Sequence, residues 1–581
     1  MMRAVIGLSV CLLATSGYAD EHWLQARLQQ LSRQRDGGDN KPVVIDIPDG
    51  VYRLEKTLKL SPDVIGDGLT LRAENSGKAI LSGGRLLPQG ERDERGLWRV
   101  PLPTDSNRFG RPRFLMIDGR LRPAARHPNT GYHRIEETLP DRRSGFVAAT
   151  GDVPNGIDDG FDLILLHDWS SSRLPVQSYD DRTRTLRTVG PIGCEADHYA
   201  IDHFEKQPRY WLEGHSAFAD VEGEWYIDAD SHELVIVGGE NQKESPTVVL
   251  PWLSELLVAS GTDKNPIGDL TIQGVVFTES RFEMPPGGYA GAQASMHEAR
   301  DERGARMSSG RAFVQAAVKI EEASGCRVTN CDFRSLGGSG LWIGGRTRDC
   351  IISRSRFAEI GGNGLNLGED NSRRVDGRTW YMAAPDQVPT GNKVERCEFS
   401  HCGQILPGAV AVWGALHRKL EITGNHIHDC PYTGISLGWL WNDRKSPAAG
   451  NIIRDNRIEF VMQVLSDGGG IYTLGRQPDT LITGNRISDI PLNAGRAESN
   501  GLFLDQGTTG LTISGNTIRR VEKSPVRFHQ CGKNIVRENR WELATDETPP
   551  VRFNRTPKEN IAVAANEVLE PQRSYFLIGN S

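Results

Sequence analysis

One short pattern recurs through the second half of the chain, and it constrains the fold more than any other feature. Its copies follow one another at 23 to 31 residues, with a single longer step of 42. A second short strand, such as GLWIG, GISLG or GLFLD, falls between most copies. A fixed period of this length with short alternating strands predicts a solenoid. The copies are VTNCDF (328–333), ISRSRF (352–357), VERCEF (394–399), ITGNHI (422–427), IRDNRI (453–458), ITGNRI (482–487), ISGNTI (513–518) and VRENRW (536–541).

The fourth position of this pattern predicts how the coils stack. It holds, in order, Cys331, Ser355, Cys397, Asn425, Asn456, Asn485, Asn516 and Asn539. Amide side chains on coils about 4.8 Å apart hydrogen-bond one another and the freed backbone groups. We therefore expect an all-β chain, a right-handed parallel β-helix with these Asn side chains in an inward ladder. Cys326 and Cys350 each precede a ladder position by five residues, so we expect them on neighbouring coils, stacked rather than disulfide-bonded.

The repeat divides the chain into segments. Residues 20–88 hold the opening coils, and 251–560 hold the main β-helix. Residues 89–250 are rich in Trp, Pro and charge and lack the ladder, which predicts an inserted antiparallel β-domain. Residues 561–581 are expected to be a C-terminal tail. Two long stretches, 282–313 and 369–391, are predicted to be irregular loops that build a binding surface.

The first 19 residues are typical of a secretory signal peptide. Arg3 gives a charged start, 4–17 an apolar run, and Gly17-Tyr18-Ala19 a cleavage site. We expect a periplasmic or extracellular protein, with no other stretch apolar enough to span a membrane. Removing Arg3 changes the net charge from −7 to about −8, which gives no field to attract nucleic acid. The eight remaining Cys show no CxxC or zinc spacing, so we expect no metal and no cofactor, and a monomer.

Repetition separates structural acids from candidate catalytic ones. Asp429 and Asp489 both lie four places after a ladder Asn, so we interpret them as turn residues. Asp505 ends the strand GLFLD, in a slot that other coils fill with Gly344, Gly368, Gly438 or Leu474. Alternation points Phe503 and Asp505 outward and Leu502 and Leu504 inward. Asp467 precedes three glycines in the adjacent coil.

Two carboxylates in one cleft suit glycoside hydrolysis, where one protonates the leaving oxygen and the other activates water or attacks. A straight strand would hold Asp467 too far from Asp505. The pair therefore requires the triple glycine to mark a sharp bend.

Further residues around this pair are candidates for substrate binding. His529 aligns with Asp505 one coil later, Gln506 follows it, and Arg476 and Arg527 flank the region and suit an acidic sugar. Aromatic residues either stack on sugar rings or cover the β-helix surface beneath the inserted domain. These are Trp342, Trp413, Trp439, Trp441 and Tyr472. We expect Trp439, Trp441, Tyr472 and His529 to line a pocket with the two aspartates.

Several segments resemble a known family. LSDGGGIYTLGRQPDT, YTGISLGWLW, GLFLDQG, FLMIDGRLRPAARHPNTGY and PPGGYAGAQA are similar to the parallel β-helix enzymes of glycoside hydrolase family 141, over most of residues 40–545. The resemblance implies a pectin-lyase-like solenoid, α-L-fucosidase action on complex pectin or xylanase action, and Asp467 and Asp505 as the catalytic pair. Gln506 stands where relatives often carry a second acid, and Cys531 replaces a more usual aromatic. Both departures bear on the substrate.

Two other functions remain open from the sequence. A polysaccharide lyase would use Arg476 and Arg527 to neutralise a uronate, and would release an unsaturated sugar that absorbs in the ultraviolet. A non-catalytic glycan-binding protein would have the aromatics without a mutually placed acid pair. In each case an oligo- or polysaccharide is the expected partner.

Overall fold

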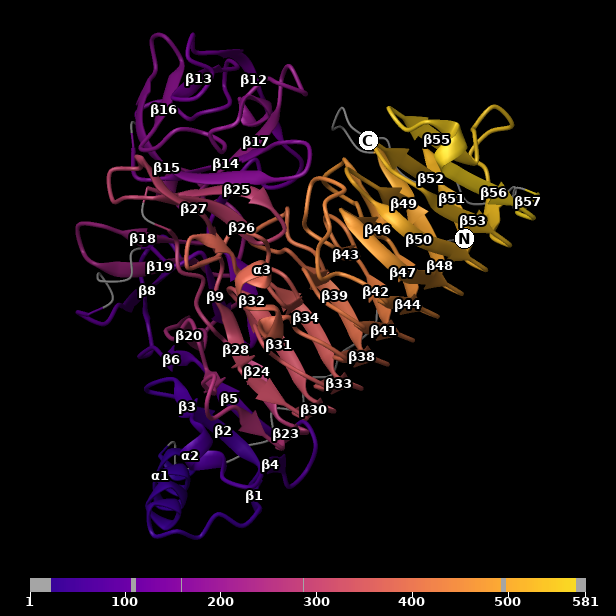
Figure 1. Cartoon of the computed structure of the whole chain (residues 1–581). Coiled ribbons are helices and arrows are strands. Elements are labelled where there is room, and N and C mark those ends of the chain that lie inside the picture. Colours follow the sequence, from indigo (N-terminus) through magenta and orange to yellow (C-terminus); the bar gives the residue numbers. More distant parts are fainter. Residues whose placement is uncertain (1–21, 106–110, 158, 286, 493–497, 571–581) are drawn as a thin grey trace.

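The repeat folds into three parallel sheets, each taking one strand from successive coils (Figure 1). Within the described part of the chain, one sheet of twelve strands runs from β1 (Val43–Ile47) to β56 (Ile561–Ala564). A second sheet of twelve runs from β2 (Gly50–Arg53) to β57 (Glu567–Leu569), and a third has eleven strands. The chain therefore forms the expected parallel β-helix.

This computed structural model describes residues 22–105, 111–157, 159–285, 287–492 and 498–570, without the side chains of 308–310. The expected signal peptide, 1–19, lies outside the described residues. Within those ranges, no helix is both long and apolar enough to span a bilayer.

The third sheet carries the features that matter for function. Its strands, in spatial order, are β3 (Leu58–Leu60), β21 (Leu257–Ser260), β28 (Ala316–Glu321), β32 (Ser339–Ile343), β35 (Leu365–Leu367), β40 (Val412–Gly414), β43 (Ile435–Leu437), β46 (Gly468–Thr473), β49 (Ser499–Leu504), β52 (Ser524–His529) and β55 (Val551–Asn554).

The asparagine ladder joins successive coils by hydrogen bonds, as expected. The Nδ2 group of Asn425 donates to Oδ1 of Asn456 at 2.9 Å, and the same bond repeats from Asn456 to Asn485 and onward to Asn539. Each Oδ1 also accepts the backbone N–H of the preceding ladder residue. The ladder continues to Asn566, and β56 and β57 extend the sheets into the segment expected to be a tail.

Turn geometry explains the recurring acids. The residue four places after each ladder position has a φ between 48° and 59° in seven successive coils. Asp429 and Asp489 are two of these seven, beside Ser335 and Phe460. The position is a repeated left-handed turn, so the structural interpretation of both aspartates is confirmed.

Apolar side chains fill the inside of the coils in matched columns. Phe277, Phe333, Phe357 and Phe399 stack with ring centroids 5.1, 4.6 and 4.6 Å apart. Cys326 and Cys350 lie side by side in the parallel register and are buried free thiols, as expected. At the N-terminal end, α1 (Trp23–Asp36) buries three leucines against the same core and covers the first coils.

The inserted domain leaves and rejoins the β-helix through an antiparallel pair, β6 (Gly84–Leu86) and β20 (Val248–Pro251). Its largest sheet contains β14 (Asp162–Leu166), β15 (Ser171–Asp180) and β17 (Arg209–Glu213). It stands beside the coils, above the third sheet (Figure 1).

One expectation about this region was wrong. Residues 282–313 are not an irregular loop, because they form β25 (Tyr289–Gln293), β26 (Met296–Arg300) and β27 (Arg306–Phe313). β25 pairs with β15 and so joins the inserted domain's sheet. The strand GGYAGAQAS consists mostly of small residues, which pack closely between layers but lack the β-branched signature of strands.

Candidate active site

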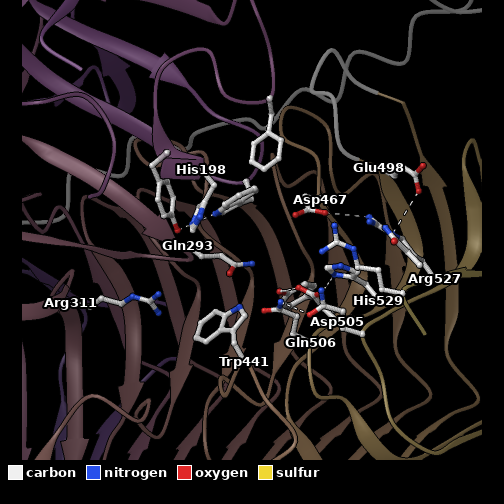
Figure 2. A pocket seen from close by; sticks show the side chains of 17 residues that line it. His198, Gln293, Arg311, Trp441, Asp467, Glu498, Asp505, Gln506, Arg527 and His529 are labelled. Carbon is white, nitrogen blue, oxygen red and sulfur yellow. Dashed lines mark hydrogen bonds and ion pairs between the residues drawn. The ribbon is translucent and has the colours of Figure 1, made fainter. Parts of the chain in front are cut away.

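A cavity of about 760 Å³ lies between the third sheet and the inserted domain (Figure 2). We call it the main cavity. Three parts of the chain line it: the β-helix, the inserted domain and the strands β25 and β27. Its lining residues are Trp169, His198, Tyr199, Phe204, Gln293, Arg311, Trp441, Asp467, Tyr472, Glu498, Asp505, Gln506, Arg527, His529, Gln530, Asn554 and Arg555.

Asp467 lines this cavity without the sharp bend that the sequence argument required, and that expectation was wrong: the three glycines are part of the strand β46 (Gly468–Thr473). Asp467 has a φ of 55° and immediately precedes β46. A Cβ added at Gly468 would lie 2.6 Å from Oγ1 of Thr433, and one at Gly469 would lie 2.8 Å from the carbonyl oxygen of Asn500. Only glycine allows the strand to press this closely on its neighbours. Asp467 thus stands at one end of β46 and Asp505 just beyond the opposite end of β49, and both carboxylates line the same cavity.

Two hydrogen bonds hold the Asp505 carboxylate. The hydroxyl of Tyr472 donates to Oδ2 at 2.7 Å, and Nδ1 of His529 lies 2.7 Å from Oδ1. The parallel register, which pairs Leu504 with Phe528, sets His529 beside Asp505 on the next coil, as the sequence predicted. Asp505 is 8% exposed, so its orientation is fixed while it still faces the cavity.

Asp467 has a different environment. Its side chain is 27% exposed, and Nη1 of Arg527 lies 3.3 Å from Oδ1. Burial and then the nearby charge of Asp505 raise the pKa of Asp467 to about 7, against the opposing effect of Arg527. Asp168 raises this pKa further. Asp467 therefore keeps its proton to a higher pH than an ordinary aspartate does.

The inserted domain contributes directly to the position of Asp467. Asp168 lies in the turn between β14 and β15, and its carbonyl oxygen accepts the backbone N–H of Ser466 at 2.7 Å. This bond fastens the tip of a distant hairpin to the residue before Asp467.

Arg527 is held from three sides. Its guanidinium lies 4.4 Å above the Phe503 ring, and its Nε lies 3.9 Å from Oε2 of Glu498. Glu498 in turn pairs with Arg552 and Lys523. With Asp467 as its third partner, Arg527 is part of a charge network around the acid (Figure 2).

Aromatic side chains from the inserted domain form the facing wall. Trp169 lies edge-on to Tyr199 and Phe204, with centroids 5.5 and 5.2 Å apart. The Tyr199 hydroxyl donates to the carbonyl of Ala292 at 2.8 Å, which ties this wall to β25. On the β-helix side, Arg311 lies 4.8 Å above the ring of Trp441. Flat apolar faces with polar groups between them suit a sugar ring.

The structure brings most of the sequence-predicted residues to the main cavity. Asp467, Asp505, His529, Tyr472, Trp441, Gln506 and Arg527 all line it. The long stretch 282–313 also contributes, through Gln293 and Arg311.

Three predicted binding residues do not line it. Trp439 is 0% and Trp413 1% exposed, because they pack on each other and beneath Phe313 of β27. They fill the surface under the antiparallel strands, which is the alternative that the sequence left open. Arg476 begins β47 (Arg476–Thr483) in the first sheet and is exposed to solvent.

Sequence reasoning missed the contribution of the inserted domain. Trp169, His198, Tyr199 and Phe204 precede Asp467 by more than 250 residues. The aromatic-rich segments HDWSSS and DHYAIDHF were a signal of a binding wall, but nothing local to them indicates which face of the β-helix they meet.

Comparisons with known proteins bear on the fold. A family model described as a right-handed β-helix region matches residues 307–439 and 390–546. The chain is a right-handed parallel β-helix protein. Its sequence matches no curated protein. A solved structure named "Glycoside hydrolase" is similar with a TM-score of 0.75 at 20% identity, covering 95% of this chain and 94% of that one.

Weaker likenesses include a complex of XylC with xylose, with a TM-score of 0.44 at 12% identity over 90% of this chain and 80% of that one. The periplasmic alginate epimerase AlgG has a TM-score of 0.32 at 11% identity over 54% and 71%. The similarity to the first structure spans nearly the whole chain, and so includes the inserted domain as well as the coils.

Proposed function

We propose that this protein is a secreted glycoside hydrolase that cleaves a glycosidic bond in a complex polysaccharide. The observation that carries the proposal is the pair Asp467 and Asp505, two carboxylates with different environments in one aromatic-walled cavity. Glycoside hydrolysis needs such a pair, one acid and one carboxylate.

Asp467 is the general acid. Because its pKa is raised to about 7, it retains a proton near neutral pH and can deliver it to the leaving oxygen. Asp505 acts on the anomeric carbon, either directly as the nucleophile or through a water molecule as the base. Its bonds with Tyr472 and His529 keep the carboxylate aimed into the cavity during this step.

The substrate class follows from the walls of the cavity. Trp169, Phe204 and Trp441 offer apolar faces for sugar rings, and Gln293, Gln506 and Arg311 offer hydrogen bonds to hydroxyl or carboxylate groups. A pectic fucoside or a xylan-like chain is the substrate that the resemblance to glycoside hydrolase family 141 favours. The solved structure named as a glycoside hydrolase supports the same reaction class.

A substrate panel tests the proposal. The protein is incubated with aryl glycosides, pectic polysaccharides and xylans, while reducing ends and ultraviolet absorbance are both recorded. We expect new reducing ends without an absorbing unsaturated sugar, and proton magnetic resonance of the first product identifies retention or inversion. An absorbing product would replace the hydrolase with a lyase. Binding without cleavage of any panel member would indicate a glycan-binding protein.

A further inference from the structure

A second cavity of about 490 Å³ opens on the same sheet as the main cavity, several coils closer to the N-terminus. It lies over β28, β32 and β35, and the long stretch 369–391 forms its rim through Glu369, Arg373 and Gln387. This stretch, predicted to be an irregular loop, contains the short helix α3 (Trp380–Ala383). This stretch is the one long interruption of the repeat among the ladder-bearing coils. The additional residues of the stretch 369–391 thus help to form a cavity that the proposed reaction does not use.

A fixed aromatic residue stands in this cavity. Trp342 is half-buried, and its Nε1 donates to the carbonyl of Gly368 at 3.0 Å. Phe313 packs against it with centroids 5.4 Å apart. Both contacts restrict the indole, so that little side-chain entropy would be lost when a ligand packs on it.

Each cation that lines this cavity is already paired with a carboxylate. Lys319 lies 2.8 Å from Glu321, and Arg373 lies 2.7 Å from Glu369. Arg346 pairs with Glu322 at 3.4 Å. The fourth lining carboxylate, Asp370, accepts from Ser372. Acids outnumber cations among the lining residues, which disfavours an anionic ligand. Carboxylates that accept and guanidinium groups that donate match the two-way hydrogen bonding of sugar hydroxyls.

Strand register relates the two cavities. Trp342 belongs to an outward column that continues through Asn366, Trp413 and Ser436 to Tyr472 of the main cavity. The four coil steps between Trp342 and Tyr472 correspond to about 19 Å along the axis. One polysaccharide molecule is long enough to reach both cavities.

We propose that the second cavity is a glycan-binding site for neutral pyranose units, with Trp342 as its stacking platform. It holds polysaccharide beside the main cavity and takes no part in bond cleavage. The inference concerns binding alone, so it stands or falls separately from the proposed hydrolysis.

Binding to an inactive form tests it. The variant Asp505→Asn is titrated with soluble xylan, xyloglucan and galactomannan as neutral probes and with polygalacturonate as an acidic probe. Hydrogen–deuterium exchange then locates the contact. We expect at least one neutral probe to bind and to protect residues 339–346. Adding Trp342→Ala should weaken the affinity about tenfold and remove that protection, whereas Trp342→Phe should retain most of both.

Controls separate a local effect from a folding defect. Thermal melting of each variant is measured, and Arg373→Ala, at a rim position 38% exposed, gives a second variant that should also weaken binding. The inference is overturned if no neutral probe binds, if protection is confined to residues 499–505, or if Trp342→Ala binds as tightly as its parent. If the wild-type protein cleaves none of these probes while residues 339–346 are still protected, the result counts against the proposed function and leaves the second cavity as a binding site.

Discussion

Asp467 occupies a position that opposes its own ionisation. Its folded pKa of about 7 stands above the ordinary value of 3.8 because of burial and the charge of Asp505. Below pH 3.8 the carboxyl is protonated in both the folded and unfolded states. As the pH rises toward 7, the unfolded chain ionises first, and stability is lost until the folded pKa is passed.

Asp467→Asn should therefore stabilise the protein at pH 8 and leave it unchanged near pH 3.5. We expect a melting temperature about 2 °C or more above wild type at pH 8, measured by calorimetry. Asp489→Asn is the matched control with the opposite sign. Burial works against ionisation of Asp489, but hydrogen bonds from Arg520 and Ser488 lower its pKa, so that change should destabilise at pH 8. A lower melting temperature for Asp467→Asn at pH 8 would contradict this account of its environment.

Asp168, which belongs to the inserted domain, raises the pKa of Asp467. Its charge contributes to the raised pKa of Asp467, so Asp168→Asn should lower that pKa and move the alkaline limb of the pH–rate profile to lower pH. Asp429→Asn, in the left-handed turn that follows an interior strand of the second sheet, serves as the control and should leave the profile in place. An unmoved alkaline limb in Asp168→Asn would rule out this tuning.

At the scale of elements, the strand β46 depends on its glycines. Gly469→Ala would place a methyl group 2.8 Å from the carbonyl oxygen of Asn500, and the backbone cannot move away without disturbing the sheet. We expect loss of activity together with a lower melting temperature. Gly268→Ala is the control, since an added Cβ there meets nothing within 4 Å. Equal activity and melting for the two variants would show that β46 is not tightly pressed against β49.

The elements of the β-helix were largely predictable because their information is local. The period of the ladder and the alternation in GLFLD specify strand, register and facing direction, which placed His529 beside Asp505. Turn position explained Asp429 and Asp489 in the same way. The strand β25 escaped prediction, because its small residues support a strand only through packing between two layers.

At the scale of the whole molecule, the site is made where two architectures meet. The β-helix supplies Asp467 and Asp505, and the inserted domain supplies the aromatic wall around Trp169. The sequence predicted the part of the site on the β-helix, because Asp467 and Asp505 stand out as departures from a repeated pattern. It could not predict the wall from the inserted domain. The docking of that domain depends on contacts between residues hundreds of positions apart, such as Ser466 with Asp168.

Trp169→Ala tests whether the aromatic wall of the inserted domain contributes to substrate binding. Under the proposed function this wall contacts sugar rings and transfers no proton, so removing the Trp169 ring should raise KM about tenfold or more while kcat changes less. Tyr132→Ala, a partly exposed aromatic of the same insert that does not line the cavity, should leave both constants unchanged. If Trp169→Ala leaves KM unchanged, substrate does not contact this wall.

The central claim is that Asp467 gives the proton and Asp505 attacks or activates water. Its most direct test is the turnover of Asp467→Asn and Asp505→Asn on a cleaved polysaccharide and on the matching dinitrophenyl glycoside, whose leaving group needs no proton. Both variants should lose about 10²- to 10⁴-fold on the polysaccharide. On the dinitrophenyl glycoside, Asp467→Asn should recover most of its rate and Asp505→Asn should not. Wild-type turnover of polysaccharide by either folded variant, or recovery by Asp505→Asn alone, would contradict the assignment.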